Sequence, residues 1–145
     1  MARTREKRRR KRIDAALALT IEYDQEKIRA ATKNISLLGT FIEVNRAIPT
    51  GTKLNIKIKL PPKGPGKSGR SREVRSEGVV FRSSPLISLR GERLYGTGIS
   101  FRSFRRGSER TLADYIDYVL LREKKAGKIF MFRRKEKLLK RKGGE

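Results

Sequence analysis

One short stretch of the chain combines side chains that could bind a ligand. Asn34, Ser36 and Gly39 stand at the spacing Asn-x-Ser-x-x-Gly between two hydrophobic segments. Asn and Ser form local hydrogen bonds, and Gly lets the backbone turn sharply or lets another group approach it closely. The same residue types make up ordinary polar turns, so the stretch by itself indicates only a turn between two strands.

A second group of ligand-binding side chains lies in residues 1–12, which contain eight Lys or Arg and one Glu. Arg8 and Arg12 are four residues apart and directly precede the first apolar alternation. The planar, permanently charged Arg side chain can bind a phosphate through two hydrogen bonds. Arg5 and Arg9 have the same spacing, so the register is open, and adjacency to the first strand favours Arg8 and Arg12.

The composition of the 145 residues indicates one domain and argues against catalysis. The chain has no Cys and no His, so it lacks thiolate and imidazole metal ligands, a thiol nucleophile and the usual general base. No pair of carboxylates stands out. We therefore expect neither an enzyme nor a metal site.

The sequence has no segment typical of a membrane protein or a secreted one. No apolar run reaches the roughly 20 residues that cross a bilayer. The apolar stretch after the basic N-terminus contains Asp14, Thr20 and Glu22, which is unlike a signal peptide. We expect a cytoplasmic protein.

Most of the net charge of +23 lies at the two ends, because residues 122–145 contain eleven Lys or Arg and three Glu. Such blocks bind anionic partners, which can be nucleic acid, an acidic membrane surface or an acidic protein. We expect a helix over about 128–141. Its apolar residues at 129–132 could dock on a membrane or nucleic acid, or fold back onto the barrel or a second copy of it.

Hydrophobic alternation with a period of two predicts strands. Leu54, Ile56 and Ile58, for example, alternate with polar residues. The predicted strands cover residues 15–23, 28–34, 40–44, 53–60, 74–82 and 93–101. Gly96 and Gly98 alternate within the last strand, which indicates close approach by a neighbouring element or a bend in a barrel.

A helix is predicted after the last strand. Ser108 is its expected N-cap, and Leu112 and Ile116 begin an apolar stripe at helical spacing that should pack on the sheet.

The first two predicted strands would form a hairpin with its turn near Gln25. Antiparallel pairing would then bring Asn34 opposite about Ala16, only a few residues from Arg12. We therefore expect the arginine run and the Asn-x-Ser-x-x-Gly turn to share one end of the hairpin.

These elements predict a mainly β fold, a six-stranded antiparallel β-barrel with a C-terminal amphipathic α-helix and a basic helical tail. Arg8-x-x-x-Arg12 before the first strand, then the Asn-x-Ser-x-x-Gly turn, then Gly-Thr-Gly-Ile-Ser-Phe in a late strand resemble the PilZ domain family. The resemblance covers about residues 8–121. The expected segments are the basic N-terminal segment 1–12, the PilZ-like barrel and helix 13–121, and the basic extension 122–145.

The resemblance implies a bacterial receptor for the second messenger cyclic di-GMP. By that resemblance, Arg8 and Arg12 would bind its phosphates and guanines. Asn34 and Ser36 would hydrogen-bond guanine, and Gly39 would let the backbone approach closely. Ligand binding would order the arginine segment over the barrel and signal to a protein partner in motility, pilus, polysaccharide or transcription machinery.

Three further basic residues are auxiliary ligand contacts by the same resemblance: Lys7, Arg9 and Arg10. The residue at position 7 is expected to influence whether one ligand or a stacked pair binds, and a basic residue there favours the pair.

Two other functions are compatible with the sequence. A small basic nucleic-acid-binding barrel, associated with RNA or the ribosome, would depend on both tails and would be indifferent to Ser36. A purely structural barrel would have lost ligand binding, which the intact motif residues argue against.

Overall fold

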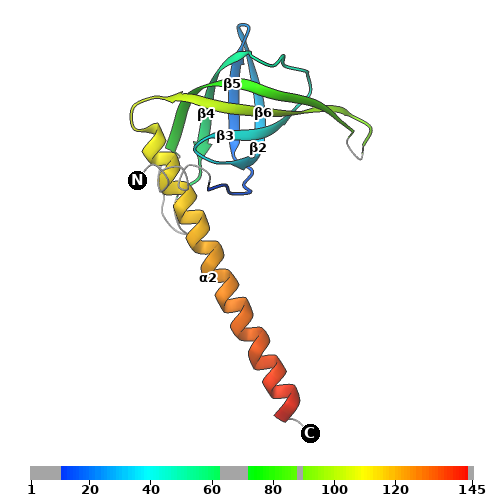
Figure 1. Cartoon of the computed structure of the whole chain (residues 1–145), viewed down its shortest axis with the longest axis vertical. Helices are drawn as coiled ribbons and strands as arrows, with labels where there is room; N and C mark the ends of the chain where they lie inside the picture. Colours follow the sequence, from blue (N-terminus) through cyan, green and yellow to red (C-terminus); the bar gives the residue numbers. More distant parts are fainter. Residues whose placement is uncertain (1–10, 63–71, 88–89, 144–145) are drawn as a thin grey trace.

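The computed structural model of the chain describes residues 11–62, 72–87 and 90–143, with side chains of the final helix described as far as Ala126. Seven elements follow one another in this part of the chain (Figure 1). They are β1 Ala18–Tyr23, β2 Glu26–Ile35, β3 Gly39–Val44, β4 Lys53–Leu60, β5 Arg72–Ile87, β6 Arg93–Phe104 and α2 Ser108–Gly143.

The strands form a closed barrel in the order β1-β2-β3-β6-β5-β4. All six pairings are antiparallel, and β4 closes onto β1 with Leu19 opposite Ile58. This confirms the predicted mainly β fold, a six-stranded antiparallel barrel with a C-terminal helix.

The barrel interior is filled by the apolar residues that stand at alternate positions along each strand. In β1, Leu19 and Ile21 are buried, while Glu22 on the opposite face is exposed. Alternate residues point to opposite faces of a strand, so one register of each strand forms the core. The helix contributes Leu112 and Ile116 to the same core. Every strand supplies buried apolar side chains, including Ile28, Ile35, Ile42, Leu54, Ile56, Ile58, Val74, Val80 and Ile99.

The start of α2 differs from the prediction. Ser108 is the first helical residue rather than the N-cap, since the N–H of Thr111 bonds the carbonyl of Gly107, which has a φ of +86°. The Ser108 hydroxyl instead accepts the backbone N–H of Arg75 at 3.0 Å. It therefore ties the helix to β5.

The β5–β6 hairpin is longer than predicted and extends past the barrel (Figure 1). Pro85 lies beyond the predicted strand 74–82, yet it belongs to β5 and lies opposite Tyr95. Pro lacks a backbone N–H and fits a strand only where that donor is not needed. Since β4 pairs with β5 only over 72–79, the edge of β5 at Pro85 has no partner strand among the described residues.

Helix α2 is continuous over 36 residues, about 54 Å at 1.5 Å per residue. Its first turns pack on the barrel, and the rest projects away from it (Figure 1). The predicted boundary at residue 121 falls inside this helix. Within the described residues, no helix combines the length and hydrophobicity needed to cross a membrane.

Candidate functional site

The segment that precedes β1 is attached to the end of β2. The Ile13 N–H donates to the Ile35 carbonyl and the Ile35 N–H donates to the Ile13 carbonyl, both at 3.0 Å. Both isoleucine side chains are buried, whereas the neighbouring Arg12 is exposed. Ile35 lies between Asn34 and Ser36 in the sequence. The backbone of Arg12 is therefore adjacent to the Asn-x-Ser-x-x-Gly turn.

The expected proximity of the two motifs is present for Arg12, but the register differs. Ile35 pairs with Ile13, so the strand partner of Asn34 is nearer the N-terminus than the expected Ala16. The reason is an irregular connection between Ile13 and β1 that is held by Thr32. Its hydroxyl accepts the Leu17 N–H at 2.8 Å and donates to the Ala15 carbonyl.

Several predicted ligand contacts lie outside the described residues. They are Arg8, Lys7, Arg9 and Arg10. Lys11 is described, and its ammonium lies 3.8 Å from the Asp117 carboxylate of α2. Both side chains are about half exposed or more, so this pair contributes less than about 1 kcal/mol, but it does link the arginine segment to the helix.

Ser36 and Gly39 form the tight connection between β2 and β3. The Ser36 N–H donates to the Gly39 carbonyl at 2.9 Å, and the Ser36 hydroxyl accepts the Leu38 N–H at 3.1 Å. Since a hydroxyl can accept and donate at once, Ser36 retains its proton for another acceptor. Its side chain is only 8% exposed, so it also has a structural role in the turn.

Gly39 is required by the packing of the barrel. A Cβ at this position would lie 2.1 Å from the carbonyl oxygen of Ile99 in β6. That atom belongs to the backbone and cannot rotate away. The absence of a side chain at Gly39 therefore has a structural cause, independent of any ligand.

Asn34 lies at the edge of this turn with its amide available. It pairs with Phe41 of β3 beside a β-bulge, and its backbone carbonyl accepts the Thr40 hydroxyl at 2.7 Å. The half-buried side-chain amide makes no hydrogen bond to another residue in the described part of the chain. It can therefore offer a donor and an acceptor to a ligand.

Two aromatic rings on the outer face were not predicted to take part in binding. Phe81 of β5 is 63% exposed, and its ring lies directly over Gly98, where a Cβ would be 2.6 Å from the ring. Phe41 covers Gly96 in the same way. The alternating glycines in β6 were the signal for such close approach, which the structure confirms. The sequence did not indicate which element approaches.

The register brings these outer-face residues into one row. Asn34 pairs with Phe41, and Phe41 pairs with Gly98, over which Phe81 lies. The row crosses four strands, about 14 Å at the usual strand spacing. It begins at the Asn-x-Ser-x-x-Gly turn and combines a polar amide with exposed aromatic surface. Such a face suits a ligand that has both hydrogen-bonding edges and flat rings.

Within residues 11–62, 72–87 and 90–143, no three His, Cys, Asp or Glu side chains gather closely enough to hold a metal ion.

We compared the chain with known protein families and solved structures. The family model for the PilZ domain matches residues 6–118. A search of curated proteins found no match. Among solved structures, the E. coli YcgR PilZ domain with c-di-GMP is similar, with 17% identity and a TM-score of 0.54, over 81% of this chain and 95% of that one.

Two longer proteins also share the fold. The Bacillus subtilis inhibitor of motility, MotI/DgrA, matches with 24% identity and a TM-score of 0.62 over 77% of this chain and 50% of that one. The Borreliella burgdorferi PlzA protein in complex with c-di-GMP matches with 12% identity and a TM-score of 0.55 over 83% and 54%. The chain thus spans about half the length of these two proteins.

Proposed function

Because the chain belongs to the PilZ domain family, we propose that it is a receptor for cyclic di-GMP that binds the ligand on the outer face beside the Asn-x-Ser-x-x-Gly turn. The backbone pairing of Ile13 with Ile35 is the main support for this site. It puts the exposed Arg12 next to the turn that contains Asn34 and Ser36. The backbone segments that carry a cation and two hydrogen-bonding side chains are thereby adjacent, although they are distant in the sequence.

Each of these side chains suits one part of the ligand. Cyclic di-GMP offers two phosphates and two guanines. The Arg12 guanidinium can bind a phosphate or the O6/N7 edge of guanine with two hydrogen bonds. The free amide of Asn34 and the remaining hydroxyl proton of Ser36 can hydrogen-bond a guanine edge. Phe81, with its exposed ring, can stack on a base.

Other residues of the arginine segment and of the turn would also contribute to ligand binding. Arg8 would act with Arg12, and Lys7, Arg9 and Arg10 would be auxiliary contacts. Gly39 would contribute by its packing and by close backbone approach. The division into 1–12, 13–121 and 122–145 separates the arginine segment, the receptor barrel and a basic extension.

We propose that the receptor has no catalytic activity and acts as an adaptor. Ligand binding would order the arginine segment over the barrel, and a protein partner would recognise the ordered surface. YcgR and PlzA are described with c-di-GMP, and MotI as an inhibitor of motility, which supports a partner in a motility or related system. A receptor for a bacterial second messenger would act in the cytoplasm.

Calorimetric titration with cyclic di-GMP tests this function. The wild type should bind saturably, and Arg12→Ala should bind roughly tenfold to a hundredfold more weakly, the effect of losing one charged hydrogen-bonding partner. Phe81→Ala should weaken binding by about tenfold, since stacking of one base contributes about 1–3 kcal/mol. Thermal unfolding of each variant would verify that the barrel is intact.

Arg29→Ala is the matched control. It removes the same side chain and charge from an exposed position of β2 that does not adjoin the turn. If Arg12→Ala and Arg29→Ala weaken binding equally, the ligand is attracted only by the overall positive charge. If the folded wild type gives no saturable binding, the receptor function is wrong.

A further inference from the structure

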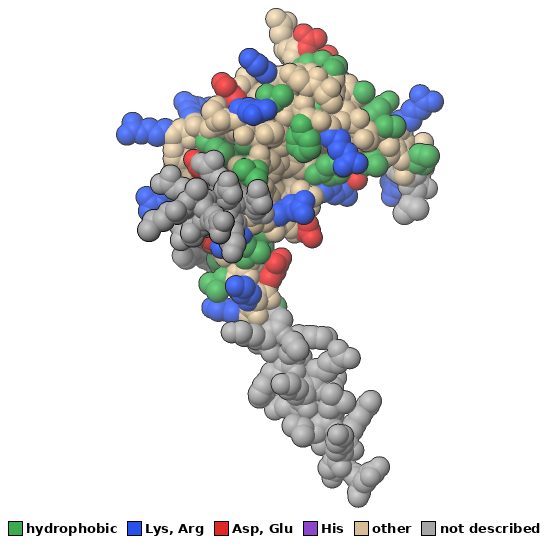
Figure 2. Space-filling model, in the orientation of Figure 1, with side chains coloured by type: hydrophobic (Ala, Val, Ile, Leu, Met, Phe, Trp, Pro, Cys, Tyr) green, Lys and Arg blue, Asp and Glu red, His purple; other side chains and the backbone are tan. Residues whose placement is uncertain are grey.

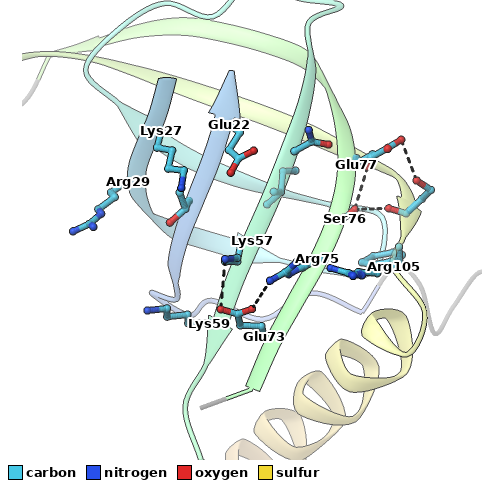
Figure 3. Close-up of a pocket in the computed structure, with 15 residues that line it drawn as sticks. Glu22, Lys27, Arg29, Lys57, Lys59, Glu73, Arg75, Ser76, Glu77 and Arg105 are labelled. Atoms are coloured by element: carbon cyan, nitrogen blue, oxygen red, sulfur yellow. Dashed lines mark hydrogen bonds and ion pairs between the residues drawn. The ribbon is translucent and has the colours of Figure 1, made fainter. Parts of the chain in front are cut away.

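A hollow of about 640 Å³ lies on the outer side of the barrel across β1, β2, β4, β5 and the end of β6 (Figure 3). None of Arg12, Asn34, Ser36 and Gly39 lines it. We call it the basic groove, because six of its fifteen lining residues are Lys or Arg and three are Glu. Figure 2 shows blue basic side chains on several sides of the barrel, so positive charge alone does not distinguish this surface.

The barrel register lines up cationic residues across the basic groove. Arg29 pairs with Thr20, Thr20 with Lys57, and Lys57 with Arg75. Directly paired residues point to the same face, so these side chains form one row about 14 Å long across four strands. Arg105 extends the row, since its backbone N–H donates to the Arg75 carbonyl at 2.9 Å. The small side chain of Thr20 leaves space in the middle.

Positive charge in this row is only partly neutralised. Glu73 contacts both Lys57, at 3.7 Å, and Arg75, at 3.3 Å, so one carboxylate serves two cations (Figure 3). Arg29 and Arg105 are exposed, and neither forms an ion pair with another described residue. The two ends of the row therefore carry charges that an anionic partner can reach.

The acidic residues of the basic groove limit which anion fits. In the adjacent row Glu22 pairs with Asn55, and Asn55 pairs with Glu77. A nucleic-acid strand carries a phosphate at every nucleotide, and some phosphates would face these carboxylates. A polypeptide can place neutral or basic residues there and acidic residues opposite the cations. The lining ring, Phe104, packs on Phe101 with centroids 5.2 Å apart and offers little stacking surface.

From this arrangement we propose that the basic groove binds an acidic segment of a partner protein. An extended peptide covers the 14 Å row with about four residues at 3.3–3.4 Å each. Two acidic residues at alternate positions would point into the groove together. They would contact the cations at the centre and one end of the row, and the next acidic residue of a longer alternating segment would reach the cation at the other end. This inference concerns a face separate from the proposed ligand site and does not depend on cyclic di-GMP.

The test is a fluorescence titration of the full chain without cyclic di-GMP. The probe is a labelled peptide of alternating glutamate and serine, and the control peptide has glutamine in place of glutamate. At about 0.15 M salt, charges more than roughly 8 Å apart are screened, so contacts within the groove should dominate. The glutamate peptide should bind and the glutamine peptide should not.

The deciding variant is Arg29→Ala combined with Arg105→Ala. It should bind the glutamate peptide about twofold to thirtyfold more weakly, as expected for two exposed charge contacts. Lys124→Ala combined with Lys125→Ala removes the same charge from exposed positions of α2 and should bind like the wild type.

Two results would overturn the proposal. Equal weakening by both double variants would assign peptide binding to overall charge. Tighter binding of a single-stranded thymidine oligonucleotide than of the peptide, lost in the Arg29 and Arg105 variant, would assign the groove to nucleic acid.

Discussion

The side chain of Thr32 should control both the stability of the barrel and the position of Arg12. Thr32 is 1% exposed, and its backbone N–H donates to the Leu17 carbonyl at 3.0 Å. Its hydroxyl accepts the Leu17 N–H and donates to the Ala15 carbonyl. These contacts hold the irregular segment between Ile13 and β1. Thr32→Val keeps the approximate shape of the side chain and removes both contacts of the hydroxyl.

The expected cost follows from the burial of the groups left behind. The Leu17 N–H is buried, and the Ala15 carbonyl is partly buried. An unsatisfied buried donor or acceptor costs about 1–3 kcal/mol, and a partly buried one costs less. We therefore expect Thr32→Val to lower the free energy of unfolding by about 2–4 kcal/mol. At this chain length the midpoint of thermal unfolding should fall by roughly 5–15 °C.

Urea denaturation measures this free energy, and cyclic di-GMP titration measures the effect on the site. Thr32→Ser is the control, because it keeps the hydroxyl and removes a methyl group, and it should lose only about 1 kcal/mol. Thr32→Val should also weaken ligand binding, since the segment that follows Arg12 is then attached to β2 by fewer hydrogen bonds. If Thr32→Val is as stable as Thr32→Ser, the hydroxyl does not hold this segment and the reasoning is refuted.

Two further predictions concern the packing of the barrel and its pH dependence. Gly39→Ala should destabilise the barrel by at least about 1–3 kcal/mol in urea denaturation, because its Cβ would overlap the Ile99 carbonyl. A variant with wild-type stability that had lost ligand binding would instead assign this glycine to the ligand. Burial, with a smaller effect of Tyr118, raises the pKa of Tyr115 above 10.0 in the folded chain. The unfolded chain then loses this proton first, so stability should fall as the pH rises above about 10, and Tyr115→Phe should flatten that fall in alkaline denaturation curves. Equal pH dependence in both proteins would contradict this assignment.

Much of the fold follows from local patterns in the sequence. The alternation in Leu54, Ile56 and Ile58 identifies β4 with its observed bounds, because a strand buried on one face needs apolar residues at every second position. The positions of the other strands were predicted to within a few residues, apart from the distal part of β5. The predicted strand ended before Pro85, whose missing N–H is tolerated because no described strand pairs with that edge of β5.

The candidate site was predicted in part. The motif residues and their approximate convergence came from the sequence, since a hairpin brings its two ends together. The pairing of Ile13 with Ile35 could not be predicted from the sequence, because it depends on an irregular segment held by the Thr32 hydroxyl. An irregular segment has no hydrophobic periodicity. The sequence also left Phe81 without a role, although it signalled close packing at Gly98.

Local periodicity is enough to predict which side chains face the barrel interior, and short motifs are enough to reveal the resemblance to the PilZ family. Which outer-face residues become neighbours depends on the tertiary structure. Arg29, Lys57 and Arg75 belong to three strands, and only the register of a closed barrel aligns them. Hydrophobic periodicity determines which side chains of a strand point into the core. The register between strands depends on contacts between segments that are distant in the sequence.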